Sequence, residues 1–170
     1  MTLSSVAAVS IAAIACGIDL RTRRIPNALT VGGAAAALVY RLATGGSAGA
    51  LDAVEGWFVG LALLLVPYAL GGMGAGDVKL LAALGAWLGP AETLWLGIYT
   101  NVAAGLMALA VAMAHGYLRQ AWDNIWLLLS HWRVVGLRPL PELTLAGGRG
   151  PRLAYAAPIL VGMVATIWLR

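Results

Sequence analysis

The sequence predicts an all-α, polytopic membrane protein with six transmembrane helices, and three observations support this fold class. Of the 170 residues 61% are apolar and only 11% are charged, whereas an ordinary soluble domain carries about 25% charged residues. The mean hydropathy is +0.86, and the apolar residues gather in six runs. Because each bilayer crossing needs about 20 apolar residues, little chain is left for a separate domain outside the membrane. A soluble enzyme and a disordered chain are both excluded.

The six runs are rich in glycine and alanine, which let helix backbones approach closely in lipid. The first run has no charged segment before it and continues into Asp19, which favours a retained helix over a cleaved signal peptide. The fourth run is cut short by Gly89 and Pro90, so we expect its helix to begin near Gly76 with a polar first turn. The expected spans lie at Leu3–Ile18, Ala28–Leu42, Val54–Leu70, Leu80–Leu88, Thr93–Ala114 and Leu153–Leu169.

Positive charge is distributed unevenly over the loops, and this predicts how the helices face. Only Arg41 and Arg170 lie on one side, whereas the other nine of the eleven basic residues follow the first, third or fifth span. Short loops rich in lysine and arginine stay in the cytoplasm. We therefore expect a multi-pass protein of the inner (plasma) membrane with both termini exterior, and no nucleic-acid binding. The nine are Arg21, Arg23, Arg24, Lys79, Arg119, Arg133, Arg138, Arg149 and Arg152.

The longest loop, from His115 to Arg152, contains one further expected helix in its first half. Tryptophan is favoured where lipid meets water, because its ring is apolar and its indole N–H is polar. We interpret this segment as a helix along the membrane surface, with a partner-binding helix as the alternative. Prolines and glycines predict an irregular loop in the second half. The residues at helical spacing are Trp122, Ile125, Trp126, Leu129 and Trp132.

Two of the seven acidic residues, Asp19 and Asp77, occur where a span meets the cytoplasmic loops. Asp19 closes the first span in GIDLRTRRIPNALT, in which Ile25, Pro26 and Asn27 turn the chain into the second helix. Asp77 opens the fourth span in GGMGAGDVKLLAALG, after glycines that leave room for an extended chain to approach. The expected topology carries both carboxylates to one face of the membrane.

A close pair of carboxylates in a partly dry site is suited to acid–base catalysis. Both cannot ionise cheaply, so one keeps a proton while the other acts as a base. The base takes a proton from a water that attacks a peptide carbonyl, and the acid polarises that carbonyl and later protonates the leaving amine. The sequence does not assign the two parts to Asp19 and Asp77. A simpler interpretation also stands, in which each caps a helix or pairs with Arg21 or Lys79.

The surroundings of these aspartates resemble a known family. An Asp followed, after a basic stretch, by Ile-Pro-Asn, together with a Gly-x-Gly-Asp at the start of another span, is similar to the motif pair of the type IV prepilin peptidases, the GxGD membrane aspartyl proteases. The segment RLAYAAPILVGMVA in the last span is similar to a third segment of that family. The resemblance thus extends over essentially the whole chain, although the loops match loosely.

The resemblance implies a catalytic pair, Asp19 and Asp77, an active-site loop shaped by Gly74 and Gly76, and a supporting role for Lys79. It implies a prepilin substrate, cut on the cytoplasmic side between a short basic leader and an apolar helix. The further partners that it implies are the lipid bilayer and the machinery of pilus assembly or secretion.

The single cysteine, Cys16, separates this chain from the longer bacterial branch, which has a cysteine-based metal site and a methyltransferase activity. The chain is more similar to the short, peptidase-only branch that serves tight-adherence (Flp) pili, or to the archaeal preflagellin peptidases. We expect one domain over residues 1–170, without an N-terminal methyltransferase or zinc segment, and neither metal nor cofactor. His115 and His131 lack metal-ligand spacing to other candidate ligands.

Three other functions are alternatives. A small ion-coupled transporter also uses intramembrane carboxylates, but its ionisable groups are expected near the bilayer midplane and often in repeated halves. A non-catalytic membrane component of a secretion system would not need both aspartates. Presenilin-like enzymes share Gly-x-Gly-Asp, but the Ile-Pro-Asn that follows Asp19 favours the prepilin branch.

Overall fold

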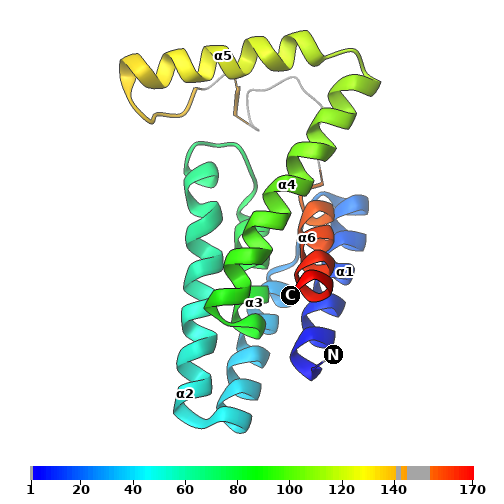
Figure 1. The fold of residues 1–170 in the computed structure, drawn as a ribbon, viewed down its shortest axis with the longest axis vertical. Coiled ribbons are helices and arrows are strands. Elements are labelled where there is room, and N and C mark those ends of the chain that lie inside the picture. Colours follow the sequence, from blue (N-terminus) through cyan, green and yellow to red (C-terminus); the bar gives the residue numbers. More distant parts are fainter. Residues whose placement is uncertain (1, 141–142, 145–153) are drawn as a thin grey trace.

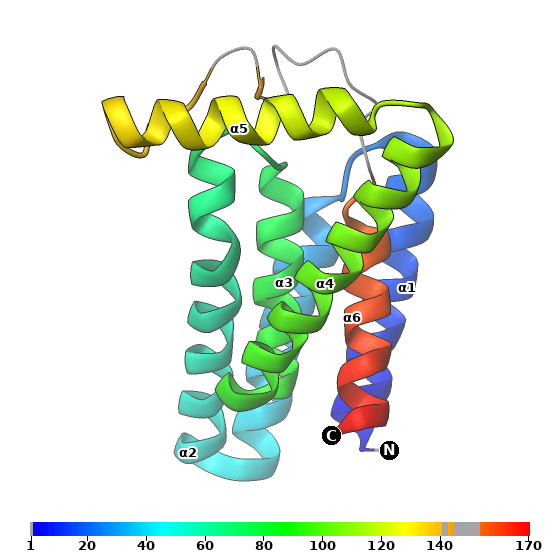
Figure 2. The ribbon, with the colours of Figure 1, turned by 45° about the horizontal axis from the view of Figure 1, so that its top comes forward.

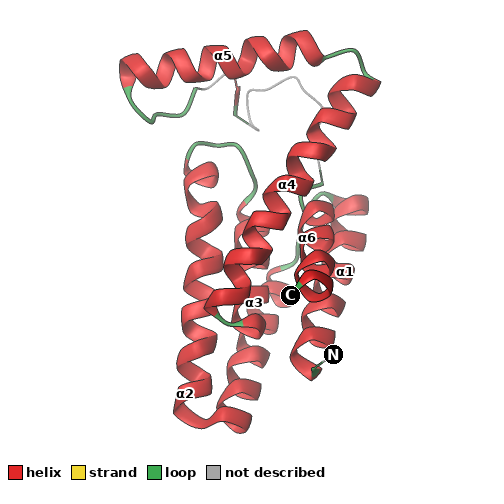
Figure 3. Cartoon of the chain, viewed as in Figure 1, coloured by secondary structure: helices red, strands yellow, loops and turns green. Residues whose placement is uncertain are grey.

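The computed structural model describes residues 2–140, 143–144 and 154–170, and these residues form helices joined by turns, with no strand among them (Figures 1 and 3). The helices α1, α2 and α4 are long and apolar enough to span a membrane, and α6 is a shorter apolar helix. The prediction of an all-helical, polytopic membrane protein is confirmed. The helices are α1 (Leu3–Thr22), α2 (Asn27–Ala69), α3 (Ala75–Leu88), α4 (Pro90–Ala114), α5 (Leu118–Val135) and α6 (Ala156–Leu169).

The long helix α2 combines the second and third expected spans. It contains one non-helical residue, Gly46, with φ 60° and ψ −148°, a conformation that residues with a side chain rarely adopt. The chain reverses there, so α2 has two antiparallel arms (Figures 1 and 2). Pro26 precedes the first arm with a φ of −62°, which is the value that its ring imposes.

The short helix α3 forms the centre of the bundle. Every residue from Leu80 to Trp87 is buried, as expected for a helix that is apolar on all sides. The second arm of α2 meets it nearly backbone to backbone, since a Cβ atom added to Gly60 would lie 2.6 Å from the carbonyl oxygen of Leu81. One turn earlier, Gly56 faces Gly85 in the same way. Glycines one turn apart therefore allow this close approach.

The loops separate into two ends of the bundle. Both chain termini and the turn at Gly46 lie at one end, and the loop after α1 and the helix α5 lie at the other (Figure 2). An even number of membrane crossings, here six, places both chain termini at the same end of the bundle. Helix α6 packs against α1 and α4, and the Gly162 backbone lies directly against Thr100.

The extra helix expected after the fifth span forms as α5, which lies across the end of the bundle (Figures 1 and 2). None of its residues is buried. The irregular loop expected after it lies largely outside the described residues. Arg149 and Arg152, two of the basic residues expected in the cytoplasmic loop, also lie outside the described residues. So does Leu153, the residue at which the last span was expected to begin.

Candidate active site

Asp19 lies in the last turn of α1 and is only 7% exposed, which makes it the one charged side chain that is buried among the described residues. The helix ends three residues later, because Arg23 adopts the left-handed conformation with a φ of 54°. In that conformation the Arg23 backbone N–H donates to the Asp19 carbonyl oxygen over 2.9 Å. Arg23 thus caps the C-terminus of α1 at the residue that carries the carboxylate.

Asp77 lies in the first turn of α3 and is partly buried. Its backbone N–H donates to the carbonyl oxygen of Gly74 over 3.2 Å, and a negative charge in a first turn is stabilised by the helix dipole. Asp19 and Asp77 interact electrostatically. Since α1 also packs against α3, two motifs from distant parts of the chain lie at the same end of the bundle.

The two glycines of the GxGD motif each face a different neighbour. A Cβ atom on Gly74 would lie 3.3 Å from Oδ2 of Asp77. A Cβ atom on Gly76 would lie 3.3 Å from Cβ of Ile25, in the loop between α1 and α2. One glycine therefore leaves space beside the carboxylate, and the other lets the two motif loops touch.

A hydrogen bond also joins the two motifs, since Nζ of Lys79 donates to Oδ1 of Asn27 over 3.0 Å. We call this bond, together with the contact between Ile25 and Gly76, the inter-motif contact. It fixes the start of α2 against the start of α3. Lys79 therefore acts on the neighbouring motif, and the N-cap of α3 is Gly74, so the Asp77 side chain does not cap this helix.

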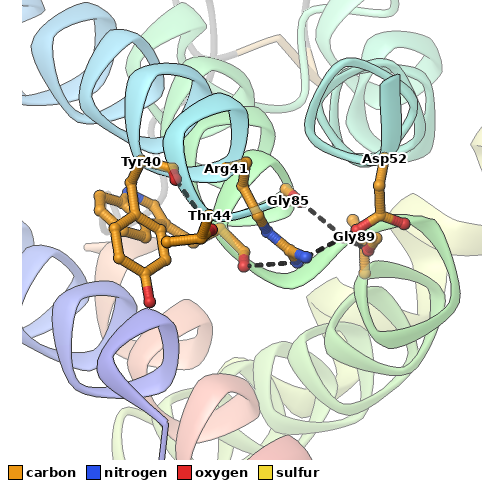
Figure 4. Close-up of polar contacts among 8 residues, drawn as sticks. Tyr40, Arg41, Thr44, Asp52, Gly85 and Gly89 are labelled. Carbon is orange, nitrogen blue, oxygen red and sulfur yellow. Dashed lines mark hydrogen bonds and ion pairs between the residues drawn. The ribbon is translucent and has the colours of Figure 1, made fainter. Parts of the chain in front are cut away.

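Arg41 fixes the opposite end of α3 (Figure 4). Its Nη1 lies 2.9 Å from Oδ2 of Asp52, and its Nη2 donates to the carbonyl oxygen of Trp87 over 2.9 Å. A cation at a helix C-terminus is favourable because the free carbonyl groups carry partial negative charge. The helix that carries Asp77 is thus connected to α2 at both ends.

Tyr155 is a third polar group at this site, and it lies in the segment RLAYAAPILVGMVA, whose resemblance to the family did not by itself assign it to the site. It is the N-cap residue of α6, it interacts electrostatically with Asp77, and its hydroxyl donates to Oδ1 of Asn101 in α4 over 3.5 Å. Only the packing of α6 against α1 and α4 brings it there. The sequence signal for it was its place in the segment that is similar to the third segment of the family.

The other candidate ligands and nucleophiles are separate from the carboxylate pair or inert. Cys16 is buried one turn before Asp19 and is a free thiol. His115 stacks on Tyr117 at the start of the surface segment. Within the described ranges, no three His, Cys, Asp or Glu residues are grouped so that they could hold a metal ion.

The fold and the site together define a polytopic membrane protein with a pair of interacting carboxylates at one end of its bundle. The sequence model of the type IV leader peptidase family matches residues 6–113, from α1 into α4, and this range includes both aspartates. The chain therefore belongs to the type IV leader peptidase family, and it is a membrane protease of the prepilin-peptidase kind. The expected family is confirmed. No curated protein and no solved structure gave a match.

Proposed function

We propose that this protein is a prepilin leader peptidase, an aspartic endopeptidase that removes the short basic leader of type IV or Flp-type prepilins at the cytoplasmic face of the inner membrane. The observation that best supports this proposal is the inter-motif contact, which holds the loop after Asp19 against the first turn of α3 that carries Asp77. The family match includes both aspartates. Their roles as the catalytic pair are part of the proposal.

In the proposed reaction, one aspartate is ionised and the other is protonated. The ionised carboxylate takes a proton from water while the water oxygen bonds to the scissile carbonyl carbon, and the protonated carboxyl group donates its proton toward the carbonyl oxygen. The tetrahedral intermediate then breaks its C–N bond, and the amine leaves with a proton from one aspartate. A hydroxyl group of the intermediate returns its proton to the other aspartate as the new carboxyl group forms. One water is consumed, and the pair returns to a single shared proton.

The surroundings of the pair support this chemistry. The burial of Asp19 keeps the site partly dry, which strengthens electrostatic interactions within it. Gly74 leaves space beside Asp77, where an extended leader would have to pass. The apolar helix of a prepilin lies in the same bilayer as the bundle, so docking between helices in lipid would bring the cleavage site to the carboxylates.

The wider assignments belong to the same proposal. The basic loops at the end of the bundle with Asp19 support a cytoplasmic site and exterior termini. The packing of the described helices into one bundle supports a single peptidase domain over residues 1–170. Pilus-assembly or secretion machinery is the proposed setting, and neither a metal nor a cofactor enters the proposed reaction.

The test is to co-express the protein with prepilins that have a short basic leader, and to measure the mass of the intact pilins. We expect leader loss with the native chain and an intact leader with Asp19→Asn and with Asp77→Asn, since each variant lacks a titratable group. Asp123→Asn, which changes an exposed aspartate in α5, is the matched control and should cleave normally. All variants are compared at equal abundance in the membrane.

If either Asn variant still cuts at the native rate, the two-aspartate mechanism is wrong. If the native chain cuts no prepilin, the proposed substrate is wrong. An unmodified amino group at the new pilin terminus would support the absence of methyltransferase activity.

A further inference from the structure

Helix α5 presents an apolar surface that no described part of the protein covers. The two tryptophans on it are 69% exposed at Trp122 and 63% exposed at Trp126. The residues on this surface recur one helical turn apart and so share one side of the helix. We call them the exposed stripe, and they are Leu118, Trp122, Ile125, Trp126 and Leu129.

The position of α5 follows from the helix before it. Helix α4 has 25 residues and is therefore about 37 Å long, which exceeds the roughly 30 Å of a bilayer's hydrocarbon core. A turn through Gly116, with a φ of +71°, separates α4 from α5. Since α4 crosses the hydrocarbon, α5 begins at the height of the lipid headgroups.

The direction of α5 suits a helix that lies on the membrane surface. It crosses the end of the bundle at a steep angle to α4, and its C-terminal part projects past α2 (Figures 1 and 2). No helix of the described chain lies beneath that projecting part. In a membrane, the space beside the bundle at this height is filled by lipid headgroups.

Positive charge borders the exposed stripe. On a helical projection Arg133 falls between Trp122 and Trp126, and Arg119 falls directly beside Trp126, while Asp123 lies farther round on the polar side. Arginine beside tryptophan is the composition that binds anionic headgroups, because the ring enters the interface while the guanidinium group stays at the phosphates. A protein partner would not require this order of charge and aromatic rings.

We propose that the exposed stripe of α5 binds the lipid bilayer surface, and that anionic headgroups strengthen this binding. Helix α5 then anchors the protein to the membrane surface at the end of the bundle where Asp19 lies. The inference is independent of the proposed peptidase reaction, because it rests on the position, exposure and charge of α5.

The test uses the whole chain in lipid nanodiscs, with Cys16→Ala as background and a nitroxide spin label on one introduced cysteine. Trp122→Cys reports on the stripe, and Gln120→Cys, on the polar side of the same turn, is the matched control. Trp126→Cys and Asp123→Cys form a second pair. For each label, the collision rate with oxygen, which concentrates in lipid, is compared with that of a water-soluble nickel chelate.

We expect the oxygen-to-nickel collision ratio to be several-fold higher at the stripe positions than at the controls. The ratio at Trp122→Cys should fall when phosphatidylglycerol is replaced by phosphatidylcholine, and also in the Arg119→Gln/Arg133→Gln variant. Equal ratios at the stripe and control positions would overturn the proposal. Protection of the stripe from both reagents would overturn it too, since a second copy or another protein would then cover the stripe. If the oxygen-to-nickel collision ratio were the same in phosphatidylglycerol and in phosphatidylcholine, the proposed role of anionic headgroups would be wrong.

Discussion

The two aspartates occupy unlike environments although they interact with each other. Asp19 is buried at the end of α1, whereas Asp77 is partly exposed and lies in the first turn of α3, where the helix dipole stabilises negative charge. A charged group buried beside another carboxylate is retained at a cost in stability, which is common at active sites. The local structure therefore favours function over stability at Asp19.

The first prediction concerns this cost. Asp19→Asn should abolish leader cleavage and at the same time raise the free energy of unfolding by about 1 kcal/mol, because the amide keeps the shape and places no ionisable group in a buried position beside Asp77. The measurement is the thermal unfolding midpoint in detergent, taken beside the cleavage assay. Asp123→Asn, at an exposed position, should leave both quantities unchanged. A lower midpoint for Asp19→Asn would mean that the carboxylate serves the fold.

The motif residues were accessible from the sequence, whereas their partners were not. The positions of Asp19, Asp77 and the glycines follow from short patterns at helix ends, which are local properties of the chain. That Lys79 bonds Asn27, or that Tyr155 reaches the field of Asp77, depends on how α3 and α6 pack against the other helices. Contacts between segments that are distant in the chain produce no regular residue spacing, so a single sequence does not reveal them.

Among the helices, α3 has the most demanding position, since it must place Asp77 against α1 while every side of it is covered. The inter-motif contact holds its first turn, and Arg41 holds its last turn. Small shifts at either end would move the carboxylate, and misplacement by about 1 Å is enough to slow an enzyme strongly. The helix is therefore a candidate for activity loss without unfolding.

The second prediction tests the inter-motif contact as a positioning device. Lys79→Met and Asn27→Leu should each slow cleavage several-fold, in line with about 1 kcal/mol for an intramolecular hydrogen bond that is exposed to solvent. The double variant should be no slower than the worse single variant, because both changes remove the same bond. The loss should appear in kcat with little change in KM. Losses that multiply in the double variant would show that the residues act separately.

The third prediction concerns the close approach of α2 to α3. Gly60→Ala should lower the free energy of unfolding by about 1–3 kcal/mol, because its Cβ would lie 2.6 Å from a backbone oxygen that cannot move aside. Gly105→Ala in α4 is the matched control, since nothing lies within 4 Å of its added Cβ. The control should be neutral or slightly stabilising. Equal effects of the two variants on the unfolding midpoint would exclude tight helix packing as the cause.

At the scale of elements, hydropathy predicted the positions of the helices well and the connections between them less well. Four of the six expected runs fall wholly within helices, and the third passes the end of α2 by one residue. The last was expected from Leu153, which lies outside the described residues, and α6 begins at Ala156. The helix of the fourth run, α3, begins at Ala75, close to the expected start near Gly76. The second and third runs, expected as separate spans, form the two antiparallel arms of α2, and a reversal at Gly46 takes the place of a longer loop between them. The segment between them is rich in turn residues, and sequence patterns do not show that a single glycine suffices for the reversal.

The whole molecule is polarised along its axis. One end has the pair Arg41–Asp52 and the pair Arg170–Glu92, whereas the other end has the three arginines after Asp19, the surface helix α5 and the carboxylate pair. This asymmetry was visible in the sequence because charge counts need no knowledge of packing. In the proposed function, this asymmetry in charge sets the side of the membrane on which the leader is cut.

The last prediction tests that side directly. In a Cys16→Ala background, a cysteine is introduced at Thr22, beside the carboxylate end of α1, or at Ser47, next to the turn in α2, and both positions are exposed. We expect a membrane-impermeant thiol reagent to label Ser47→Cys in intact cells and Thr22→Cys only after the inner membrane is opened, because basic loops stay in the cytoplasm. The reverse pattern would put Asp19 and Asp77 on the exterior face. A leader that is cut before export would then be out of their reach, and cytoplasmic cleavage would be excluded even if the pair proved catalytic.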